Sequence, residues 1–344
     1  MPILDARTLE DTTRDIFVAL GVSRDDAMWI ATLLVRANLR GHDSHGVIRV
    51  PQYVASVKAG DTVVTPTITV PIDAPTLAVV DGGRGFGQIV ARRGITLAID
   101  KARAQGLAAV ALRNTNHVGR LADYAEMAAA QGLIGLVWVN VPTALNVAPW
   151  GGAARRLGTN PHAIAFPGPG GTVAMSLDFA TSVIAEGKLR VKFNRGENCA
   201  PGIMLNGRGE PSIDPREFYA HPVGTLLTAG EHKGFGLSLA IEILAGILSG
   251  TGAARGAQGP STNGTLMIGI DTTRFLPLED FHAQVSELLR FVRSAPLAAG
   301  AKEILIPGEP EERMARERRA NGIPIDATTW EQIRVCAAEA GVHA

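Results

Sequence analysis

Between residues 76 and 140 the sequence alternates between short apolar runs and longer segments with helical periodicity, and this alternation restricts the fold more than any other feature. The apolar runs TLAVVD, LAAVALR and LIGLVWVN predict strands at 76–81, 107–113 and 133–140. The segments between them, at 88–104 and 121–131, predict helices. Helices that alternate with apolar strands indicate an α/β layer architecture.

Three further apolar runs add strands to this pattern. HAIAFPG, TVAMSLDFA and TLMIGID predict strands at 162–168, 172–180 and 265–271, and a long apolar helix is predicted from Phe235 to Leu248. The first two of these strands follow each other with no helix between them. Such close spacing requires an antiparallel pair, so we expect a large mixed sheet flanked by helices.

Helical patterns dominate both ends of the chain. Ser23 provides an N-cap, with Asp26 three residues later, for a helix that we expect to end at Gly41, and a second helix is predicted from Pro51 to Lys58. Near the C-terminus, helices are predicted at 280–294, 314–322 and 328–341, with the turn IPGEPEE before the second. The simplest layout is a helical domain built from residues 1–75 and 276–344, and an α/β domain at 76–275.

Charge and cysteine content exclude several classes of protein. Lys+Arg and Asp+Glu number 33 each, and no basic cluster is present, so we expect neither nucleic-acid nor membrane binding. Cys199 and Cys336 lie far apart and form no disulfide or zinc-site pattern. The N-terminal segment lacks a signal-peptide pattern, and no apolar run is long enough to cross a bilayer. These observations predict a cytoplasmic protein with a small-molecule partner.

The segment GHDSHGVIRVPQY, at 41–53, concentrates reactive side chains just after a predicted helix end. Ser44 and His45 are adjacent, and Arg49 lies four residues later, where it can share a side with His45. An imidazole beside a guanidinium suits a carboxylate substrate whose neighbouring oxygen gains or loses a proton. The alternative is a polar corner capped by its own side chains. His42 and His45 alone do not make a metal site, because no other ligand cluster supports them.

Two more candidates lie at strand ends. His117 follows the strand at 107–113, where α/β proteins place ligand contacts, although it could also cap the next helix. Asp178 lies between Leu177 and Phe179 and should be partly buried, so it needs a histidine, an arginine or hydrogen-bond donors as partners. A carboxylate can orient and charge a histidine, and a structural ion pair is the alternative.

Two glycine-containing segments are candidate phosphate sites. His232 and Lys233 open the long apolar helix, where free N–H groups and a lysine would attract an anion, unless the glycines there only permit tight packing. The glycines at 81–87 do not follow GxGxxG spacing, and Asp100 falls within a helix. A Rossmann dinucleotide site is therefore weakly supported.

Several motifs occur together in a fixed order: RGHDSHGVIRVPQY, RNTNHVG, APWGG with LGTNP, MSLDFATS, GKL with RGE, HKGFGLSLAIEILAGILSG, and IPGE with NGI. In this combination the sequence resembles the malate/L-lactate dehydrogenase family, also called sulfolactate dehydrogenase-like, from about residue 10 to 335. The resemblance implies a non-Rossmann cofactor domain with a large mixed sheet, a helical domain, and a homodimer whose active site lies near the domain and subunit junction.

The resemblance also implies roles for individual residues. His45 would be the proton donor, with Ser44 and Asp178 as its relay partners. Arg49 would hold the substrate carboxylate, and His117 would lie close to the substrate or the nicotinamide. The expected cofactor-binding residues, for NAD or NADP, are Ala174, Met175, Ser176, Leu177, Asp178, Phe179, Ala180, His232, Lys233, Gly308, Glu309 and Pro310.

Two features depart from the family pattern. Glu231 stands where family members often have glycine, which adds a negative charge beside the expected phosphate site and could shift cofactor affinity or the choice between NAD and NADP. The segment GTLMIGIDTTRF lacks aromatic residues that are common there. Neither departure alters a residue of the motif around His45.

Family resemblance leaves the substrate open. Members act on lactate, malate, sulfolactate, ureidoglycolate, diketogulonate or cyclic imino acids, and the shared motif reads only the carboxylate and the adjacent C=O or C=N. Contacts to the rest of the substrate are expected from the loops at 140–149 and 254–264. The leading expectation is a 2-hydroxy acid dehydrogenase. The alternatives are a cyclic imino acid reductase and a protein that binds nicotinamide or an organic acid without turnover.

Overall fold

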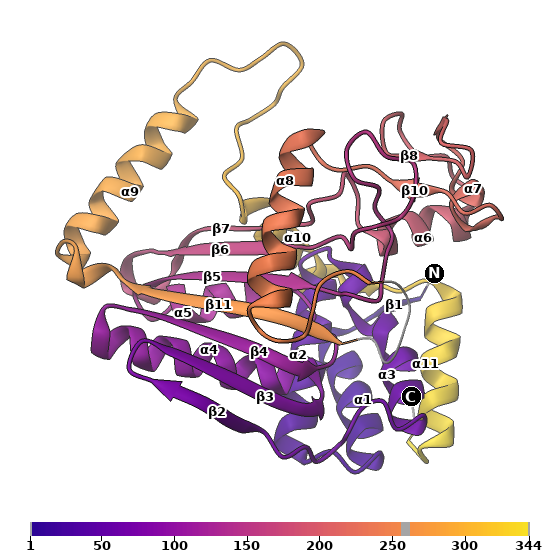
Figure 1. The fold of residues 1–344 in the computed structure, drawn as a ribbon, viewed down its shortest axis with the longest axis horizontal. Helices are drawn as coiled ribbons and strands as arrows, with labels where there is room; N and C mark the ends of the chain where they lie inside the picture. Colours follow the sequence, from indigo (N-terminus) through magenta and orange to yellow (C-terminus); the bar gives the residue numbers. More distant parts are fainter. Residues whose placement is uncertain (1, 256–261, 343–344) are drawn as a thin grey trace.

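A seven-stranded mixed sheet forms the centre of the computed structural model, which describes residues 2–255 and 262–342 (Figure 1). The strand order is β2-β3-β4-β11-β5-β6-β7. Only β3 and β4 pair in parallel; every other neighbouring pair is antiparallel. The bounds are β2 (Thr69–Ala74), β3 (Leu77–Gly85), β4 (Leu107–Thr115), β5 (Leu133–Asn140), β6 (His162–Pro167), β7 (Val173–Phe179) and β11 (Asn263–Asp271). The predicted mixed sheet is confirmed.

Strand β11 is inserted between two strands that precede it by more than a hundred residues. Its fully buried Met267 pairs with Val110 of β4 on one side and Val137 of β5 on the other. This insertion joins the parallel β3–β4 pair to the antiparallel half of the sheet. Strand β7 lies at one edge of the sheet, with β6 as its single neighbour. The site described below lies along that edge.

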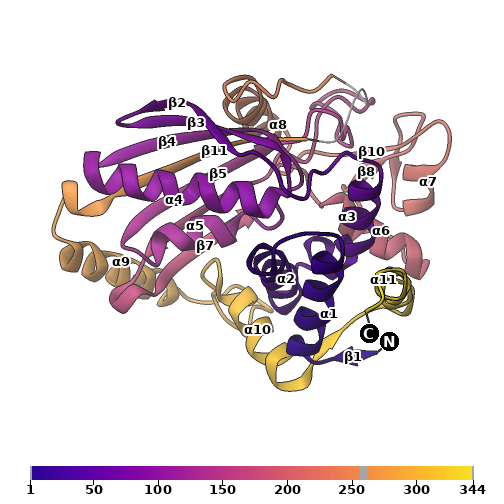
Figure 2. The same cartoon turned by 90° about the horizontal axis from the view of Figure 1, so that it is seen from below.

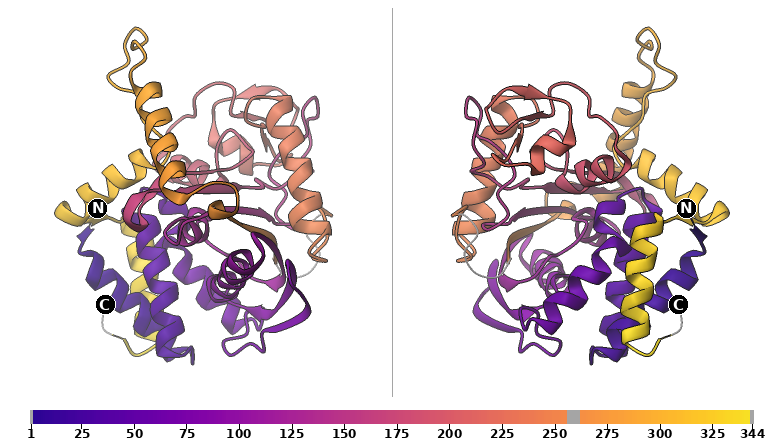
Figure 3. Two further views of the ribbon diagram at one scale, coloured as in Figure 1. Left: turned by 90° about the vertical axis from the view of Figure 1, so that its left-hand side faces the viewer. Right: turned by 90° about the vertical axis from the view of Figure 1, so that its right-hand side faces the viewer.

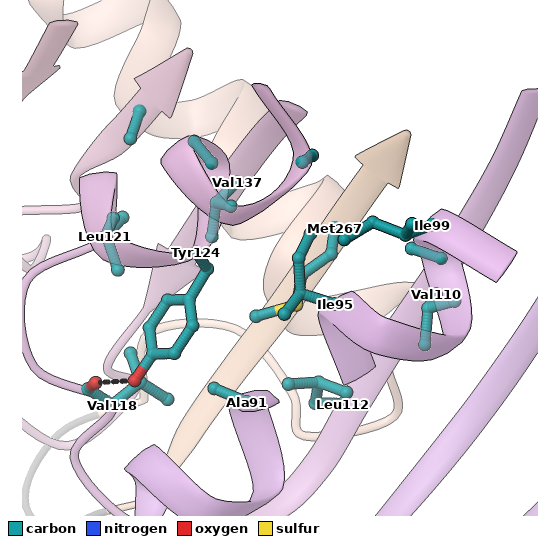
Figure 4. Close-up of a cluster of buried hydrophobic side chains, with 14 of the residues drawn as sticks. Ala91, Ile95, Ile99, Val110, Leu112, Val118, Leu121, Tyr124, Val137 and Met267 are labelled. Atoms are coloured by element: carbon teal, nitrogen blue, oxygen red, sulfur yellow. Dashed lines mark hydrogen bonds between the residues drawn. The ribbon is translucent and has the colours of Figure 1, made fainter. Parts of the chain in front are cut away.

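Helices cover both faces of the sheet (Figure 2). On one face lie α4 (Gly87–Gln105) and α5 (Ala122–Ala129), and on the other lie α8 (His232–Ile241) and its π-helical continuation at Glu242–Ile247. A Cβ on Gly135 of β5 would lie 2.5 Å from a backbone oxygen of α5, so glycine permits this close contact. Figure 4 shows the resulting core, in which Ile95, Leu112 and Tyr124 surround Met267.

A helical cluster combines both ends of the chain (Figure 3). It contains α1 (Ala6–Ala19), α2 (Arg24–Leu39), α3 (Val50–Lys58), α10 (Glu309–Asn321), α11 (Ala327–Glu339) and the pair β1 (Ile3–Leu4) with β12 (Ile323–Pro324). Ser23 caps α2 as predicted, because its Oγ accepts the Asp26 N–H at 3.2 Å. The division into two domains stays a prediction. Strand β2, which belongs to the sheet, falls within the expected helical part.

Several elements differ from the sequence-based expectation. A three-stranded sheet, β10-β8-β9, and two helices form a small layer above the edge of the main sheet; the elements are α6 (Glu186–Arg195), β8 (Met204–Leu205), β9 (Pro211–Ser212), α7 (Pro215–Tyr219) and β10 (Thr225–Leu226). Helix α8 begins at His232 rather than Phe235. Helix α10 begins at Glu309, inside the expected turn, because proline is tolerated in a first helical turn.

Helix α9 (Leu278–Arg293) projects away from the rest of the molecule (Figure 1). None of its residues is buried, and several nearby apolar side chains are exposed, including Phe275 and Phe291 at 73% and 74%. The expected helix is confirmed, but it does not pack in the helical cluster. Over the described residues, no helix combines the length and apolar character required to cross a membrane.

Candidate active site

The segment after α2 forms a rigid corner at the junction between the helical cluster and the sheet. Two short 3-10 turns, Asp43–His45 and Val47–Arg49, follow Gly41, whose φ of +79° favours glycine. The buried carboxamide of Asn38 donates to Asp43 at 2.7 Å and accepts the Val47 N–H at 2.8 Å. A Cβ on Gly46 would lie 2.1 Å from Asn38 Oδ1. The backbone around His45 is therefore fixed before any ligand binds.

His45 faces a cavity of about 300 Å³ between this corner and the edge strand β7. Ser44 Oγ and His45 Nδ1 are hydrogen-bonded at 3.0 Å, and the role of Ser44 as a relay partner stays a prediction. Burial, followed by the nearby positive charges of Arg49 and His42, lowers the pKa of His45 to about 3. The imidazole is thus neutral at pH 7 and able to accept a proton.

Asp178 lines the same cavity as His45. Within the described residues its carboxylate makes one hydrogen bond, accepted from the backbone N–H of Ala122 at 2.8 Å, and none to His45. The expected hydrogen-bond donor is present, but it is a backbone N–H, that of the first residue of α5, rather than a side chain. A relay from Asp178 to His45 stays a prediction, because the present contacts hold Asp178 against α5.

Arg49 adjoins His45 but is not among the residues that line its cavity. Its Nε donates to the Ser44 carbonyl at 2.7 Å, and its Nη1 donates to Gln52 at 2.7 Å. The guanidinium therefore supports the backbone of the corner. Its expected role as the carboxylate clamp stays a prediction.

His117 lies beside His45 from the other side of the junction. The two rings are stacked, with centroids 5.5 Å apart and planes inclined by 26°. Tyr53 Oη lies 2.7 Å from His117 Nδ1, and Gln88 Nε2 donates to Tyr53 Oη at 2.7 Å. Burial, with Arg49 and His45, lowers the pKa of His117 well below its usual value. The structure thus brings both predicted histidines together.

Sequence reasoning missed two cations on the cavity wall, Arg120 and Lys188. Arg120 is 4% exposed and donates to Asp123 at 3.0 Å and to Glu126 at 2.9 Å. Lys188 is exposed on α6, which packs closely against the corner, since a Cβ on Gly187 would lie 2.5 Å from Ser44 Cβ. Asp123 and Glu126 offset the charge of Arg120, so the exposed ammonium of Lys188 is the group on this wall that suits an anionic ligand. Lys188 lies in GKL, one of the motifs that carry the family resemblance, but the sequence analysis gives this lysine no role.

Two of the three expected cofactor segments, 174–180 and 308–310, meet along β7. A second cavity, of about 550 Å³, is lined by 173–176, by Gly308 and Glu309, and by cations that include Arg313 and Arg316. The Ser176 N–H donates to the Pro307 carbonyl at 3.1 Å, and a Cβ on Gly308 would lie 3.2 Å from the Ser176 carbonyl oxygen. Residues 178–180 of the same segment line the His45 cavity. Pro310 lies in the first turn of α10 and lines neither cavity.

This arrangement fits a nicotinamide dinucleotide. Such a molecule is long, with a nucleotide at one end and the reactive ring at the other, and β7 runs from one cavity to the other. In the sheet the strand is paired only with β6. On its outer edge the Ser176 N–H already bonds to Pro307, so only the other outward backbone groups are available to a ligand. The residues present are therefore compatible with the expected cofactor.

His232 and Lys233 begin α8 and are exposed, and neither lines the two cavities. The His232 ring lies 5.6 Å from the Trp150 ring, and Ala229, three residues before it, lines the His45 cavity. Glu231 adopts φ of +58°, a conformation that favours glycine. A glycine, which the family resemblance implies at this position, would adopt that conformation with less strain. Cofactor contact by the pair stays a prediction.

The loops expected to contact the rest of the substrate are only partly described. Residues 256–261, in the loop at 254–264, lie outside the described residues. In the loop at 140–149, Val147 is buried in a small apolar cluster with Leu157 and Phe218. This loop is therefore anchored to the layer that covers the site.

Comparison with known proteins gives consistent matches. The profile of the family described as malate/L-lactate dehydrogenase matches residues 4–334. Hydroxycarboxylate dehydrogenase B of Escherichia coli (strain K12) is 37% identical, over 98% of this chain and 94% of that protein. L-sulfolactate dehydrogenase of Methanocaldococcus jannaschii is 39% identical, over 96% of this chain and 94% of that protein.

Solved structures agree over the full length. A structure described as a malate/lactate dehydrogenase from E. coli has a TM-score of 0.94 and 36% identity, and it covers 100% of this chain and 96% of that one. A delta1-piperideine-2-carboxylate reductase from Pseudomonas syringae has a TM-score of 0.83 and 30% identity, with 98% and 100% covered.

Proposed function

Since the chain belongs to the malate/L-lactate dehydrogenase family, we propose that it transfers a hydride between NAD or NADP and C2 of a small 2-hydroxy or 2-oxo acid such as malate or L-lactate. The observation that carries this proposal is His45. It is a neutral, partly buried imidazole on the wall of a cavity that also contains Arg120 and Lys188. In this proposal the ammonium of Lys188 attracts the carboxylate, and the imidazole exchanges the proton of the neighbouring oxygen.

The bound nicotinamide would supply the hydride acceptor or donor. In this proposal it is held by residues 174–180, by His232 with Lys233, and by residues 308–310. The polypeptide supplies the binding edge, the orientation and the proton transfer. The tight contact between Gly308 and Ser176 supports this role for β7, because it brings α10 to the end of the strand that lines the larger cavity.

His45 performs the proton transfer in both directions. During oxidation its free ring nitrogen accepts the hydroxyl proton as the C2 carbonyl forms, and during reduction the protonated ring returns that proton to the oxygen. For the other ring nitrogen, Nε2, to be free, Nδ1 carries the ring proton and donates to Ser44 Oγ, 3.0 Å away, which orients the ring. In the proposed arrangement Asp178 stabilises the charged ring and Arg49 fixes the substrate carboxylate, which orients the carbonyl for attack.

A second candidate function is reduction of a cyclic imino acid. The structural match to a piperideine-carboxylate reductase favours it, because the same hydride geometry serves C=N. Binding without turnover is a third alternative, and the intact set of Ser44, His45, Arg49 and Asp178 weighs against it.

Turnover with a substrate panel tests these alternatives. We expect NADH or NADPH to be consumed with pyruvate, oxaloacetate or another 2-oxo acid, measured as the loss of reduced-nicotinamide absorbance. Faster consumption with piperideine-2-carboxylate or pyrroline-2-carboxylate would favour the imine reductase. Cofactor binding in a fluorescence titration, with no consumption on any compound, would contradict an enzymatic function on this panel.

We also propose that the protein is a homodimer and that α9 contributes to the interface. The helix is unburied, and Leu288 and Phe291 are 58% and 74% exposed on it. Exposed apolar side chains gathered on one projecting element are typical of an interaction surface. The location proposed for the dimer is the cytoplasm, because both cysteines are free and buried, and cell fractionation checks this point.

The double variant Leu288→Glu/Phe291→Glu should be monomeric, because the two carboxylates would have to be desolvated in the interface. Sedimentation velocity on the wild type and the variant measures this change. Ser286→Glu, which adds a charge on another side of the same helix, should remain dimeric. A monomeric wild type would refute the dimer, and a dimeric double variant would refute the role of α9.

A further inference from the structure

A buried carboxylate, that of Glu242, joins three other segments of the chain. Glu242 is 4% exposed and begins the π-helical continuation of α8. Its Oε1 accepts a hydrogen bond from Asn160 Nδ2 at 2.8 Å. Its Oε2 accepts hydrogen bonds from Asn140 Nδ2 at 3.0 Å and from the Ala254 N–H at 2.8 Å. Both carboxylate oxygens therefore act as acceptors for neutral N–H donors.

The orientation of the two carboxamides follows from the groups that surround them. Asn160 Nδ2 also lies 2.9 Å from Ser238 Oγ, and Asn140 Nδ2 donates to the Gly252 carbonyl at 3.0 Å. Turning either amide over would place its oxygen against the carboxylate of Glu242, so the NH₂ groups must face that carboxylate. The oxygen of each amide is buried without a donor among the described residues, which costs less than leaving a buried carboxylate without its donors.

Glycines make room for both carboxamides. A Cβ on Gly158 would lie 2.8 Å from Asn160 Oδ1, and a Cβ on Gly246 would lie 2.3 Å from Asn140 Nδ2. Asn160 itself adopts φ of +32°, which asparagine tolerates better than most residues. This cluster therefore accounts for residues of two motifs, LGTNP and HKGFGLSLAIEILAGILSG, that have no part in the proposed proton transfer.

The cluster is connected to the wall of the His45 cavity. Thr159 and Pro161, on either side of Asn160, both line that cavity. The Thr159 carbonyl also accepts hydrogen bonds from Thr181, from its N–H at 2.9 Å and from its Oγ1 at 3.0 Å. Displacement of Asn160 would therefore move this wall, while the corner that holds the imidazole stays in place.

We propose that Glu242 is a positioning residue, which holds the cavity wall at 159–161 and the segment 252–254 in one arrangement and thereby sets how tightly the cavity binds the carboxylate substrate. The effect on the substrate rests on the proposed function, whereas the link between the segments does not. The π-helical turn at Glu242 supports the assignment, because such turns are rare and recur at functional sites. Neither Thr159 nor Pro161 transfers a proton or a hydride in the proposed reaction, so the wall contributes to binding and not to the chemical step.

Hydrogen exchange at the Ala254 amide tests the link without a substrate. In the cofactor-free wild type we expect this amide to be protected, because it donates to a buried carboxylate. In Glu242→Gln it should exchange about tenfold faster, because a carboxamide has one acceptor oxygen and cannot accept from donors at both ends. An unprotected Ala254 amide in the wild type, or equal exchange in the two proteins, would overturn the inference.

The double variant Glu242→Gln/Asn160→Asp is the matched rescue. The carboxylate introduced at 160 can accept from the amide introduced at 242, and the amide oxygen at 242 can still accept from Asn140 and Ala254. Protection of the Ala254 amide should therefore return. This variant and the wild-type measurement keep the test valid if the single variant does not fold.

Steady-state kinetics at saturating cofactor test the effect on substrate binding. Glu242→Gln should raise KM for the acid about tenfold and change kcat less than about twofold, and the double variant should restore KM. Mere loss of folded enzyme would instead lower kcat at constant KM. Glu331→Gln makes the same change at an exposed carboxylate and should match the wild type.

Two kinetic results would refute the role of Glu242 in substrate binding: an unchanged KM in the single variant, or a KM in the double variant as high as in the single one. A wild type without turnover on any compound would refute the proposed function and the substrate part of this inference. The exchange measurement would still decide whether Glu242 links the segments.

Discussion

Replacing His45 with glutamine is expected to lower kcat for hydroxy-acid oxidation by about 10²–10⁴-fold, the range that a single general acid–base group contributes. Glutamine has a similar size and can still bond to Ser44, so the corner should keep its shape. It cannot accept the substrate proton, so the loss should appear in kcat rather than in cofactor affinity. Turnover and a fluorescence titration of the reduced cofactor measure the two effects separately.

The pKa of His45 also predicts how kcat/KM in each direction of the reaction depends on pH. With a pKa of about 3 in the free protein, His45 is already deprotonated across pH 5–8, so kcat/KM for oxidation should stay level there with respect to this group. Reduction needs the protonated ring, whose population falls about tenfold for each pH unit above that pKa, so kcat/KM for reduction should decrease as the pH rises.

His221→Gln, a substitution of an exposed histidine in a loop, is the matched control and should retain wild-type turnover. If the His45 variant has an unchanged circular dichroism spectrum and still retains more than half of the turnover, the assignment of His45 as the acid–base group is wrong.

Long, strongly periodic segments made most of the fold predictable. The runs at 107–113 and 133–140 form strands β4 and β5, and their continuous apolar character fits a sheet that helices cover on both faces. Ser23 caps α2 because its hydroxyl oxygen can accept a backbone N–H of the first helical turn. The insertion of β11 between β4 and β5 could not be predicted, because an apolar strand pairs equally well with several others. The two-residue strands β8, β9 and β10 are too short to give any periodic signal.

In the site, contacts between residues that are adjacent in the sequence were predictable, and contacts between distant residues were not. Ser44 and His45 are adjacent, and their hydrogen bond follows from that adjacency. Tyr53 lies 64 residues before His117 and 35 before Gln88, so their contacts depend on how α3 packs against α4, which no local pattern encodes. The sequence predicts Arg49 from its spacing to His45, its guanidinium and the family resemblance, and only the structure reveals that its guanidinium is bonded to the backbone of the corner.

The second prediction with a large expected effect concerns the stability of the fold. It rests on the ion pairs that are buried behind the His45 cavity. Arg120 is 2% exposed in its side chain and pairs with Asp123, at 1%, and with Glu126, at 10%. Burial lowers the pKa of Arg120, but the carboxylates of Asp123 and Glu126 outweigh it and raise that pKa above its ordinary value. The guanidinium is therefore charged at any working pH. It shares the buried Asp123 with Arg36 and the mostly buried Glu126 with Arg40.

Arg120→Met should lower the free energy of unfolding by about 3 kcal/mol, the low end of the cost of breaking a buried ion pair, because Arg36 and Arg40 still pair with the two carboxylates. Urea denaturation measures this change, and Arg334→Met, which breaks an exposed pair with Glu331, should cost less than about 1 kcal/mol. Adding Asp123→Leu to Arg120→Met should recover part of the loss, since it removes one of the stranded charges. A single variant within 1 kcal/mol of the wild type, or a double variant less stable than the single one, would show that this network is not held by charge compensation.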